Sequence, residues 1–553
     1  MEENEFIRLI ERSIEENWDY PALTNYQKDS FKYSEVAVKI QWLHCIYEKL
    51  GIKKGDKVAL IGRNLNTWGI VYLGTITYGA TIVPILPDFN SNDIHHILNH
   101  SESKLLFSTD ILFNKIDDTK VKTLLGVFSL THLNILSDSK SKLSKAVEYA
   151  DKYILENKLE KTDIKYSRKV SNDDMAVLSY TSGSSGFSKG VMLPYRSLAL
   201  NVTYGIKYLE FDKGDRVVSF LPLAHVFGCT FEFLLEFCRG VEVVFVTRIP
   251  SPQMIMKAFK EVKPKLVLTV PLIIEKLYKR KILPVLNSTK VKMMLKVPFL
   301  EQQVYKKINE ELIASFGGNF TQVIIGGAAL SSEVEAFLKK IKFPFTVGYG
   351  MTECGPLISY ANHNTHKKFS CGYAIDNIEI KILSESPSEI PGEVLVKGDN
   401  VMLGYYKNAD ENKKVFTKDG WMRTGDMGVV DSDGYLFLRG RTKNMILGAS
   451  GQNIYPEEIE AQLNNMPYIL ETVVTDDSNS KLVALAYPDY ETLDRKGINS
   501  KEEIEKLFEK NRQLINKTLP AYMQLTKIQL YPEEFKKTPK KNIKRYLYTD
   551  MFK

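Results

Sequence analysis

Short apolar runs recur along the first 330 residues, and segments with helical spacing separate them. The runs KVALIG at 57–62 and ATIVPIL at 80–86 are typical of buried strands, and the stretch from Trp68 to Tyr78 between them is typical of a helix. Strands and helices that alternate in this way predict an α/β fold in which the sheets are largely buried. Similar apolar runs lie at 175–180, 216–221, 241–247, 265–270 and 321–326.

The pattern changes after about residue 370, where short strands and turns dominate. The pair Asp433-Gly434 between two apolar runs is a hairpin signal. Past residue 444 the chain has a compact α+β pattern, in which PEEIEAQLNNM is helical and ILETVVT and KLVALAYP are strand-like. We therefore expect a large α/β portion with several subdomains at 1–440, a hinge at 441–444 and a small, mobile α+β domain at 445–553.

Composition and charge limit the classes of protein that fit. Hydrophobic residues make up 44% and charged residues 25% of the 553 positions, which excludes disorder over most of the length. The five cysteines form no C-x-x-C pair, so a disulfide framework and a zinc site are both disfavoured and a reducing cytoplasm is expected. The net charge of +7 suits anionic small ligands and at most peripheral membrane contact, and it indicates no nucleic-acid partner. The acidic N-terminus and the lack of a long apolar run indicate neither a secretory signal nor a spanning segment.

A strand-like run, MAVLSY at 175–180, leads into a segment that is rich in glycine and hydroxyl side chains. Small residues let successive backbone N–H groups and hydroxyls converge on a polyphosphate, and Lys189 supplies a countercharge. The spacing does not fit a Walker A loop. A flexible Gly/Ser loop is the alternative for such a cluster taken alone. The segment consists of Thr181, Ser182, Gly183, Ser184, Ser185, Gly186, Phe187, Ser188 and Lys189.

Two further motifs carry groups that suit a nucleotide. In GYGMTECGP at 348–356, Tyr349 offers a flat face for a base, Thr352 a hydroxyl for a phosphate and Glu353 a hard oxygen for Mg²⁺. In WMRTGD at 421–426, followed by GRTKN at 440–444, Asp426 can accept both hydroxyls of a ribose. A Gly-rich turn and a turn aspartate are the structural alternatives.

The three motifs, in this order and spacing, resemble the adenylate-forming superfamily of acyl-CoA synthetases, peptide-synthetase adenylation domains and luciferases. The phosphate loop is similar to the family's YTSGTTGxPKG, with Ser184-Ser185 for Thr-Thr and Ser188 for Pro. PLAHVFG at 222–228, GGAAL at 326–330 and NIYPEEIE at 453–460 are also similar to family segments. The resemblance covers nearly the whole chain and is strongest to bacterial long-chain fatty-acid–CoA ligases.

This resemblance implies a reaction in two steps. A fatty-acid carboxylate attacks the α-phosphate of Mg-ATP and gives an acyl-adenylate and pyrophosphate, and CoA then displaces AMP. The implied ligands are thus a fatty acid, ATP, Mg²⁺ and CoA. Two half-reactions in one cleft need either two sets of catalytic residues side by side or a movement that exchanges one set for the other. A mobile small domain supplies this movement.

The resemblance also implies a role for each matched residue. The nucleotide-binding set continues from Tyr349 through Gly350 and Met351 to Thr352. His225 lies near the acyl carboxylate, although a hydrogen-bonded histidine at a strand end is the structural alternative. The implied roles are β- and γ-phosphate binding for Thr181 to Lys189, adenine and acyl contacts for Gly327, Ala328 and Ala329, α-phosphate contact for Thr352, Mg²⁺ binding for Thr181 and Glu353, ribose binding for Asp426 and Arg441, the hinge at Lys443, and entry of the 448–451 loop for thioester formation.

The chain departs from the family near its C-terminus. The family's K-T-x-x-G-K-I-x-R places a lysine between the substrate carboxylate and the α-phosphate, but the matching stretch here is KTPKKNIKR at 537–545. This alignment puts Asn542 at the catalytic position and Lys541 one residue earlier. Either Lys541 or another nearby lysine supplies the charge, or the first step is impaired. A fatty-acid–AMP ligase that loads an acyl-carrier protein, and a first-step-impaired binder of acyl-adenylate or acyl-CoA, therefore remain open beside the acyl-CoA synthetase. Neither the chain length of the acid nor the oligomeric state is indicated.

Overall fold

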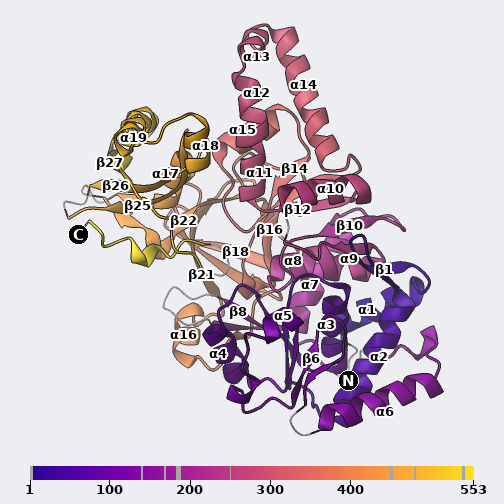
Figure 1. Ribbon diagram of the computed structural model, residues 1–553. Coiled ribbons are helices and arrows are strands. Elements are labelled where there is room, and N and C mark those ends of the chain that lie inside the picture. The colour runs from indigo at the N-terminus through magenta and orange to yellow at the C-terminus, as the bar shows by residue number, and fades with distance from the viewer. Residues whose placement is uncertain are drawn as a thin grey trace.

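The computed structural model describes residues 4–138, 141–166, 170–181, 189–249, 251–448, 452–478, 481–538 and 542–552. Figure 1 shows the N-terminal half as layers of sheet and helix, with the last hundred residues packed as a separate lobe on one side. The strand and helix segments expected from the apolar patterns are confirmed, so the fold is α/β with a small α+β unit at the C-terminus.

The largest sheet has eight strands in the order β20-β9-β8-β4-β3-β5-β6-β7. The five strands from β8 to β6 run parallel, and β7, β9 and β20 are antiparallel to their neighbours. All five residues of β4 are buried, as expected for a parallel sheet with both faces covered. The strands are β3 (Lys57–Ile61), β4 (Thr81–Ile85), β5 (Leu105–Ser108), β6 (Gly126–Ser129), β7 (Ile135–Ser137), β8 (Met175–Thr181), β9 (Lys189–Pro194) and β20 (Gly404–Tyr405).

Helix α3 (Asn66–Tyr78) is buried on nearly every side, and two glycines make this packing possible. A Cβ added at Gly69 would come within 2.9 Å of the Phe233 ring, and one at Gly74 within 2.6 Å of the Leu43 side chain. This part of the chain also forms other α-helices. They are α1 (Glu5–Glu16), α2 (Tyr33–Lys49), α4 (Ser91–Ser101), α5 (Asp110–Phe113), α6 (Lys142–Glu156) and α7 (Tyr195–Tyr208).

Two smaller sheets continue the α/β portion. One has the order β10-β11-β1-β2, and the other is the parallel sheet β12-β13-β14. The helix that follows β10 changes from α8 through the π-helix η3 to α9 without a break. The bounds are β1 (Pro21–Asn25), β2 (Ser30–Lys32), β10 (Arg216–Ser219), α8 (Val226–Cys229), η3 (Thr230–Leu234), α9 (Leu235–Arg239), β11 (Glu242–Phe245), α10 (Pro252–Val262), β12 (Leu266–Thr269), β13 (Gln322–Ile325), α15 (Ser332–Lys340) and β14 (Phe345–Val347).

The connection between the neighbouring strands β12 and β13 is much longer than a parallel crossover requires. Its helices rise from the body as a hairpin, which stands apart at the top of Figure 1. Residues 276–307 of this hairpin are called the helical arm below. The connection contains α11 (Pro271–Leu277), the π-helix η4 (Tyr278–Ile282), α12 (Leu283–Asn287), α13 (Thr289–Met294) and α14 (Pro298–Ser315).

Antiparallel strands follow, as the change of pattern after residue 370 predicts. The Asp433-Gly434 pair lies in the turn between β21 and β22, which are antiparallel. The elements are β15 (Tyr349–Gly350), β16 (Leu357–Tyr360), β17 (Tyr373–Ala374), β18 (Ile378–Leu383), β19 (Gly392–Gly398), α16 (Ala409–Val415), β21 (Met422–Val430) and β22 (Leu436–Arg441).

The C-terminal unit has its own hydrophobic clusters, built from residues after 445. The short 3₁₀ turn η6 (Thr442–Asn444) joins it to β22, so the hinge proposed at 441–444 falls where the sheet β18-β19-β21-β22 ends. Its elements are β23 (Ile446–Leu447), β24 (Asn453–Ile454), α17 (Pro456–Leu463), β25 (Ile469–Asp476), β26 (Leu482–Pro488), α18 (Tyr490–Arg495), α19 (Lys501–Asn516) and β27 (Leu525–Leu530).

Contacts to the base of the helical arm hold the C-terminal unit against the rest of the chain. Arg280 pairs with Glu491 at 2.5 Å, and Lys279 donates to the backbone carbonyl of Asn464. Asn465 contacts Ser331 beside them. None of the helices in the described part of the chain has the length and apolar character that crossing a bilayer requires.

Candidate active site

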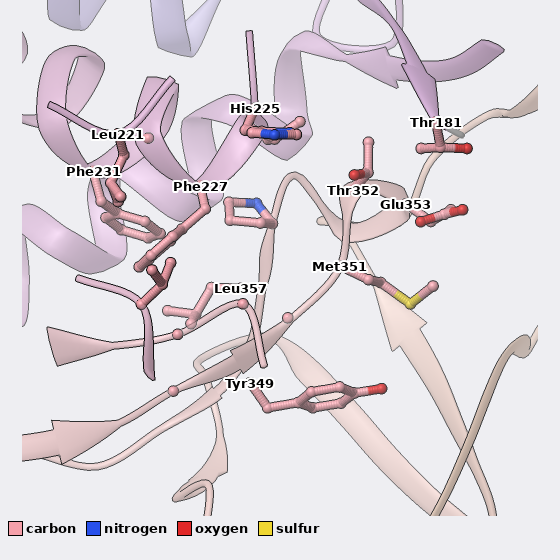
Figure 2. Close-up of a pocket in the computed structure, with 18 of the residues that line it drawn as sticks. Thr181, Leu221, His225, Phe227, Phe231, Tyr349, Met351, Thr352, Glu353 and Leu357 are labelled. Atoms are coloured by element: carbon pink, nitrogen blue, oxygen red, sulfur yellow. The ribbon is translucent and has the colours of Figure 1, made fainter. Parts of the chain in front are cut away.

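A cavity of about 460 Å³ lies where the larger sheets, the antiparallel region and the C-terminal unit meet. Figure 2 shows hydroxyl and carboxylate groups of Thr181, Thr352 and Glu353 on one side of it, and the apolar side chains of Leu221 and Phe231 on the other. Segments that are far apart in the sequence therefore contribute to one site. Among its lining residues are Thr181, Lys189, His225, Gly327, Tyr349, Gly350, Met351, Thr352, Glu353, Arg441, Lys443 and Asn542.

The loop from Gly348 to Pro356 is fixed by close backbone contacts. A Cβ on Gly350 would come within 2.3 Å of the Pro356 carbonyl oxygen, and one on Gly355 within 2.1 Å of Ser197 Oγ. Gly355 also has a φ of +65°, which favours glycine. The loop turns through a 3₁₀ segment at Thr352–Cys354 and presents Thr352 and Glu353 to the cavity. Glu353 is buried and accepts a hydrogen bond at Oε1 from Tyr405 Oη, at 2.9 Å.

Tyr349, Asp426 and Arg441 form a connected group at the cavity. Tyr349 Oη donates to Asp426 Oδ2 at 2.7 Å, and Arg441 Nε lies 3.1 Å from Asp426 Oδ1. Asp426 and Arg441 are direct partners across β21 and β22, which explains why two residues fifteen positions apart meet. Burial raises the pKa of Asp426, and the charge of Arg441 opposes that rise. The group brings together the residues that sequence reasoning assigned separately to adenine and to ribose.

Thr181 ends β8 and Lys189 begins β9, so the two strands bracket the expected phosphate loop. Ser182, Gly183, Ser184, Ser185 and Gly186 lie outside the described residues. The Lys189 ammonium pairs with Glu411 of α16 and lies 5.1 Å from the centre of the Tyr405 ring. Lys189 lowers the pKa of Glu411, which keeps this carboxylate charged.

Sequence reasoning missed Glu411, because nothing in ADENKKV at 409–415 shows where this short helix packs. Asn412, one residue further on, fixes α16 beside the sheet. It donates to the Tyr405 carbonyl at 3.0 Å and accepts from the Tyr405 N–H at 2.7 Å. The pairing of Glu411 with Lys189 thus depends on a contact between residues more than 200 positions apart, which leaves no local pattern.

His225 is the N-cap residue of α8 and lines the cavity, and Figure 2 shows it between the apolar and the polar side chains. The segment before it is held by the buried Glu232, whose Oε2 accepts from the backbone N–H groups of Phe220 and Leu221, both at 2.9 Å. Burial raises the pKa of Glu232 well above its usual value. An acidic residue among apolar residues at helical spacing is a signal for such a positioning role. The sequence analysis did not single out Glu232 on this ground.

The aromatic segment at 225–237, which sequence reasoning left open between acyl tunnel and core, divides between the two. Phe227 and Phe231 line the cavity, whereas Phe233 and Phe237 are fully buried in the core. Further apolar lining comes from neighbouring elements and includes Tyr204, Leu209, Leu221, Leu268, Val270, Ile324, Leu357 and Tyr360. Of the GGAAL motif, Gly326 and Gly327 line the cavity, and Ala328 and Ala329 are exposed beside it.

Asn542 lies at the cavity, and Lys541 lies outside the described residues. The Thr538 N–H donates to the Asn542 carbonyl at 2.8 Å, and Lys537 forms a β-bridge with Ile543. Arg545 anchors this loop, because its Nη1 lies 2.6 Å from each oxygen of the buried Glu460. The position that the family alignment gives to a lysine is therefore occupied by a neutral amide.

Four lysine and arginine side chains line the cavity in the described part of the chain. Three of them are in ion pairs: Lys189 with Glu411, Arg423 with Glu393, and Arg441 with Asp426. Lys443 forms no ion pair with any described carboxylate. Burial, together with the neighbouring charges of Arg441 and Lys189, lowers the pKa of Lys443.

Comparisons with known proteins identify the family of this chain. A family model described as AMP-binding enzyme matches residues 10–406. The probable 4-coumarate–CoA ligase 3 of Dictyostelium discoideum is 28% identical over 454 residues, which cover 79% of this chain and 77% of that protein. The long-chain-fatty-acid–CoA ligase of Escherichia coli O157:H7 is 27% identical over 493 residues, which cover 84% and 82%.

The fold is also that of solved structures. The anthranilate CoA ligase AuaEII in complex with anthranoyl-AMP matches with a TM-score of 0.77 at 18% identity, over 98% of this chain and 96% of that one. ATP-bound MatB from Rhodopseudomonas palustris matches with a TM-score of 0.76 at 20% identity, over 100% of both chains. Because the family model covers well over half of the sequence, the chain belongs to the AMP-binding enzymes, the adenylate-forming superfamily that includes the acyl-CoA synthetases.

Proposed function

We propose that this enzyme activates a fatty acid with ATP and transfers the acyl group to CoA. In the first step a carboxylate oxygen attacks the α-phosphorus, the bond to the bridging oxygen breaks, and pyrophosphate leaves. In the second step the CoA thiolate attacks the acyl carbon and AMP leaves. The thioester and AMP are the final organic products.

One observation carries the proposal: a single cavity has one end lined by groups that suit a nucleotide and another end lined by apolar side chains. Tyr349, Asp426 and Arg441 offer an aromatic face and ribose-binding groups at the first end. Phe227, Phe231 and their apolar neighbours line the other. An apolar wall of this kind favours an acid with a hydrocarbon chain, since burial of each CH₂ contributes about 0.8 kcal/mol.

The residues between the two ends fit Mg-ATP chemistry. A carboxylate, a hydroxyl and the phosphate oxygens are the kind of donor set that Mg²⁺ takes, and Glu353 and Thr181 would supply the protein's share. Bound there, Mg²⁺ would neutralise phosphate charge. We assign Thr352 to the α-phosphate and His225 to the acid's carboxylate, and the position of both residues in the cavity lining supports this assignment. Glu232 holds the backbone before His225 in place, so it is a positioning residue.

Lys443 is the residue that we propose for the first-step charge. With Asn542 at the usual lysine position, a cation must come from elsewhere to neutralise charge as the carboxylate approaches the α-phosphate. The other three cations of the described lining are already paired with carboxylates. The Lys443 ammonium, which pairs with no described carboxylate, is therefore the source that we propose.

We further propose that the unit at 445–553 turns about 441–444 between the two steps. Lys443 then serves both as a cation and as part of the turning segment. The polar contacts at the arm base support such a movement, because hydrogen bonds and ion pairs of this kind can be exchanged for contacts with water.

The deciding experiment is an acid series from butanoate to octadecanoate, with 4-coumarate added, assayed for pyrophosphate release and for CoA thioester. We expect both products, with rates that rise with chain length and exceed the rate with 4-coumarate. Thioester formed only on an acyl-carrier protein would make the chain a fatty-acid–AMP ligase. If no acid gave pyrophosphate, the chain would be a binder of acyl-adenylate or acyl-CoA, and the proposal would be overturned.

A further inference from the structure

The helical arm concentrates the positive charge of the whole molecule. Residues 276–307 contain nine basic side chains and one acidic one, a net charge of +8, whereas the whole chain carries +7. The other 521 residues together are thus nearly neutral, at −1. The nine are Lys276, Lys279, Arg280, Lys281, Lys290, Lys292, Lys296, Lys306 and Lys307.

Few of these charges are neutralised within the protein. Arg280 and Lys279 face the C-terminal unit, and Lys306 lies 3.9 Å from Glu310. Glu301, the acid of the arm, pairs with Lys340 of α15 at 2.8 Å. Lys290, Lys292 and Lys296, near the tip, form no ion pair with a described carboxylate.

The same tip leaves apolar side chains uncovered. Helices α12 and α13 contain no buried residue, although more than half of their positions are apolar. Met293 is 60% exposed and Phe299 is 69% exposed, and Val285 and Val297 are each 46% exposed. By contrast, Val304, Ile308 and Leu312 bury the base of α14 against the body, so the exposure is confined to the end that projects in Figure 1.

We propose that the tip of the helical arm docks the enzyme on an anionic phospholipid bilayer. The lysines lie against the headgroups, and Met293, Val297 and Phe299 enter the boundary between headgroups and acyl chains. This combination of a basic face with exposed apolar side chains is how interfacial helices bind anionic membranes. A nucleic acid would be held by the lysines alone and would leave the apolar side chains in water.

The arm is connected directly to the cavity. Val270, just before α11, and Ile324 of β13 both line the cavity, and the arm is inserted between these two positions. Docking through the tip would therefore tether the cavity to the membrane through the arm. This part of the argument rests on the proposed function, because a fatty acid dissolves in that membrane.

The test is flotation of the purified full chain with vesicles of phosphatidylcholine, alone or mixed two to one with phosphatidylglycerol, without ATP, acid or CoA. We expect salt-sensitive binding to the mixed vesicles only. K290Q/K292Q/K296Q should weaken it by roughly 10²-fold, since each lysine near an anionic surface contributes a factor of about five. F299S should weaken it at least severalfold, because an apolar anchor is lost. The emission of an F299W variant should shift to the blue on the same vesicles.

The matched control is K142Q/K145Q/K152Q on α6, which removes the same charge at the opposite end of Figure 1 and should bind like the parent. If both triple variants lost vesicle binding equally, the net charge of the protein would account for binding, and the proposal would be overturned. Parent-like binding by K290Q/K292Q/K296Q would also overturn it. Tighter binding to a short RNA duplex than to vesicles, lost in that variant, would assign the arm to nucleic acid. Because no substrate is present, failure here is distinct from failure of the ligase activity.

Discussion

At the scale of single residues, Glu353 combines two roles that one substitution can separate. Its Oε1 accepts from Tyr405, and the side chain lines the cavity. Glutamine keeps an oxygen for Tyr405 but is a much poorer ligand for Mg²⁺. We expect E353Q to lower the rate of pyrophosphate release by about 10²–10³-fold, the usual cost of one lost charge contact.

Thermal unfolding of E353Q should match that of the parent. Y405F, which removes the hydroxyl donor and keeps the carboxylate, is the control and should retain most of the activity. A near-normal rate for E353Q at saturating Mg²⁺ would remove Glu353 from the metal site.

Lys443 and Asn542 can be tested as a pair, because we assign to Lys443 the positive charge that Asn542 lacks. K443Q should lower pyrophosphate release by about 10²–10³-fold. N542K alone should change it less than about threefold, and N542K/K443Q should recover most of the loss, since either lysine neutralises the same charge. The measurement is pyrophosphate release, with thioester formation from preformed acyl-adenylate as the second readout.

Three results would contradict this assignment. K443Q within about threefold of the parent would mean that another group, such as Lys541, supplies the charge. A loss that N542K does not repair would point to a purely mechanical role in the turning segment. A large gain from N542K alone would mean that the first step of the parent is impaired.

At the scale of elements, the helix formed by α8, η3 and α9 carries a buried acid without a described hydrogen-bond partner. Glu236 is fully buried, and burial raises its pKa well above the usual value. The folded protein therefore keeps it neutral, whereas the unfolded chain ionises it above pH ~4.3. Stability from this group is present at low pH and declines as the pH rises, by up to about 1.4 kcal/mol per pH unit.

We expect E236Q, which cannot ionise, to gain stability relative to the parent as the pH rises from about 5 to 8. Urea unfolding of both proteins across that range measures the difference. E48Q on the surface of α2 is the control, because its carboxyl is exposed. A constant difference between E236Q and the parent would show that the carboxyl is already charged in the fold.

Most elements could be predicted from sequence because burial imposes a period on their side chains. Helix α1 buries Phe6, Ile10 and Ile14 at helical spacing, β4 and α3 are buried over almost their full lengths and are rich in apolar residues, and α19 begins at a capping box, Ser500 to Glu503. Strand β20 could not be predicted, since two residues carry no period and its partner β9 lies 210 positions earlier. The helical arm was missed for a different reason: its apolar residues predict helices, but not that those helices leave the body.

The candidate site divides in the same way. Motif residues such as Thr352 and Tyr349 could be named because their types and spacing match a chemistry. The pairing of Lys189 with Glu411, and the contact of Glu232 with two backbone N–H groups, could not, because each depends on how distant elements pack. The departure at Asn542 could be read from the family motif, but only the structure shows that Lys443, which pairs with no described carboxylate, lines the same cavity.

At the scale of the whole molecule, the proposed rotation requires the C-terminal unit to leave the base of the arm. Arg280 and Glu491 are exposed and meet across that interface at 2.5 Å. Cysteines at both positions, joined by a bismaleimide with a cleavable disulfide, would tie the two parts together. We expect the tied R280C/E491C protein to release pyrophosphate in a single turnover and to form no thioester, because the second step needs the rotated arrangement.

Reduction of the linker should restore thioester formation. Each single cysteine variant treated with the same reagent is the control and should perform both steps. Thioester formation at the parent rate in the tied protein would show that no large rotation about 441–444 is needed.

The pairing of β20 with β9 has a consequence for synthesis on the ribosome. Strand β9 is complete at residue 194, but the strand that covers its outer edge is made only at residues 404–405. At 5–20 residues per second, the edge stays open for roughly 10–40 seconds. The unpaired edge of a strand can pair with a strand of another nascent chain, which leads to aggregation. Slow translation between these two strands should therefore lower the yield of active enzyme more than slow translation after residue 405.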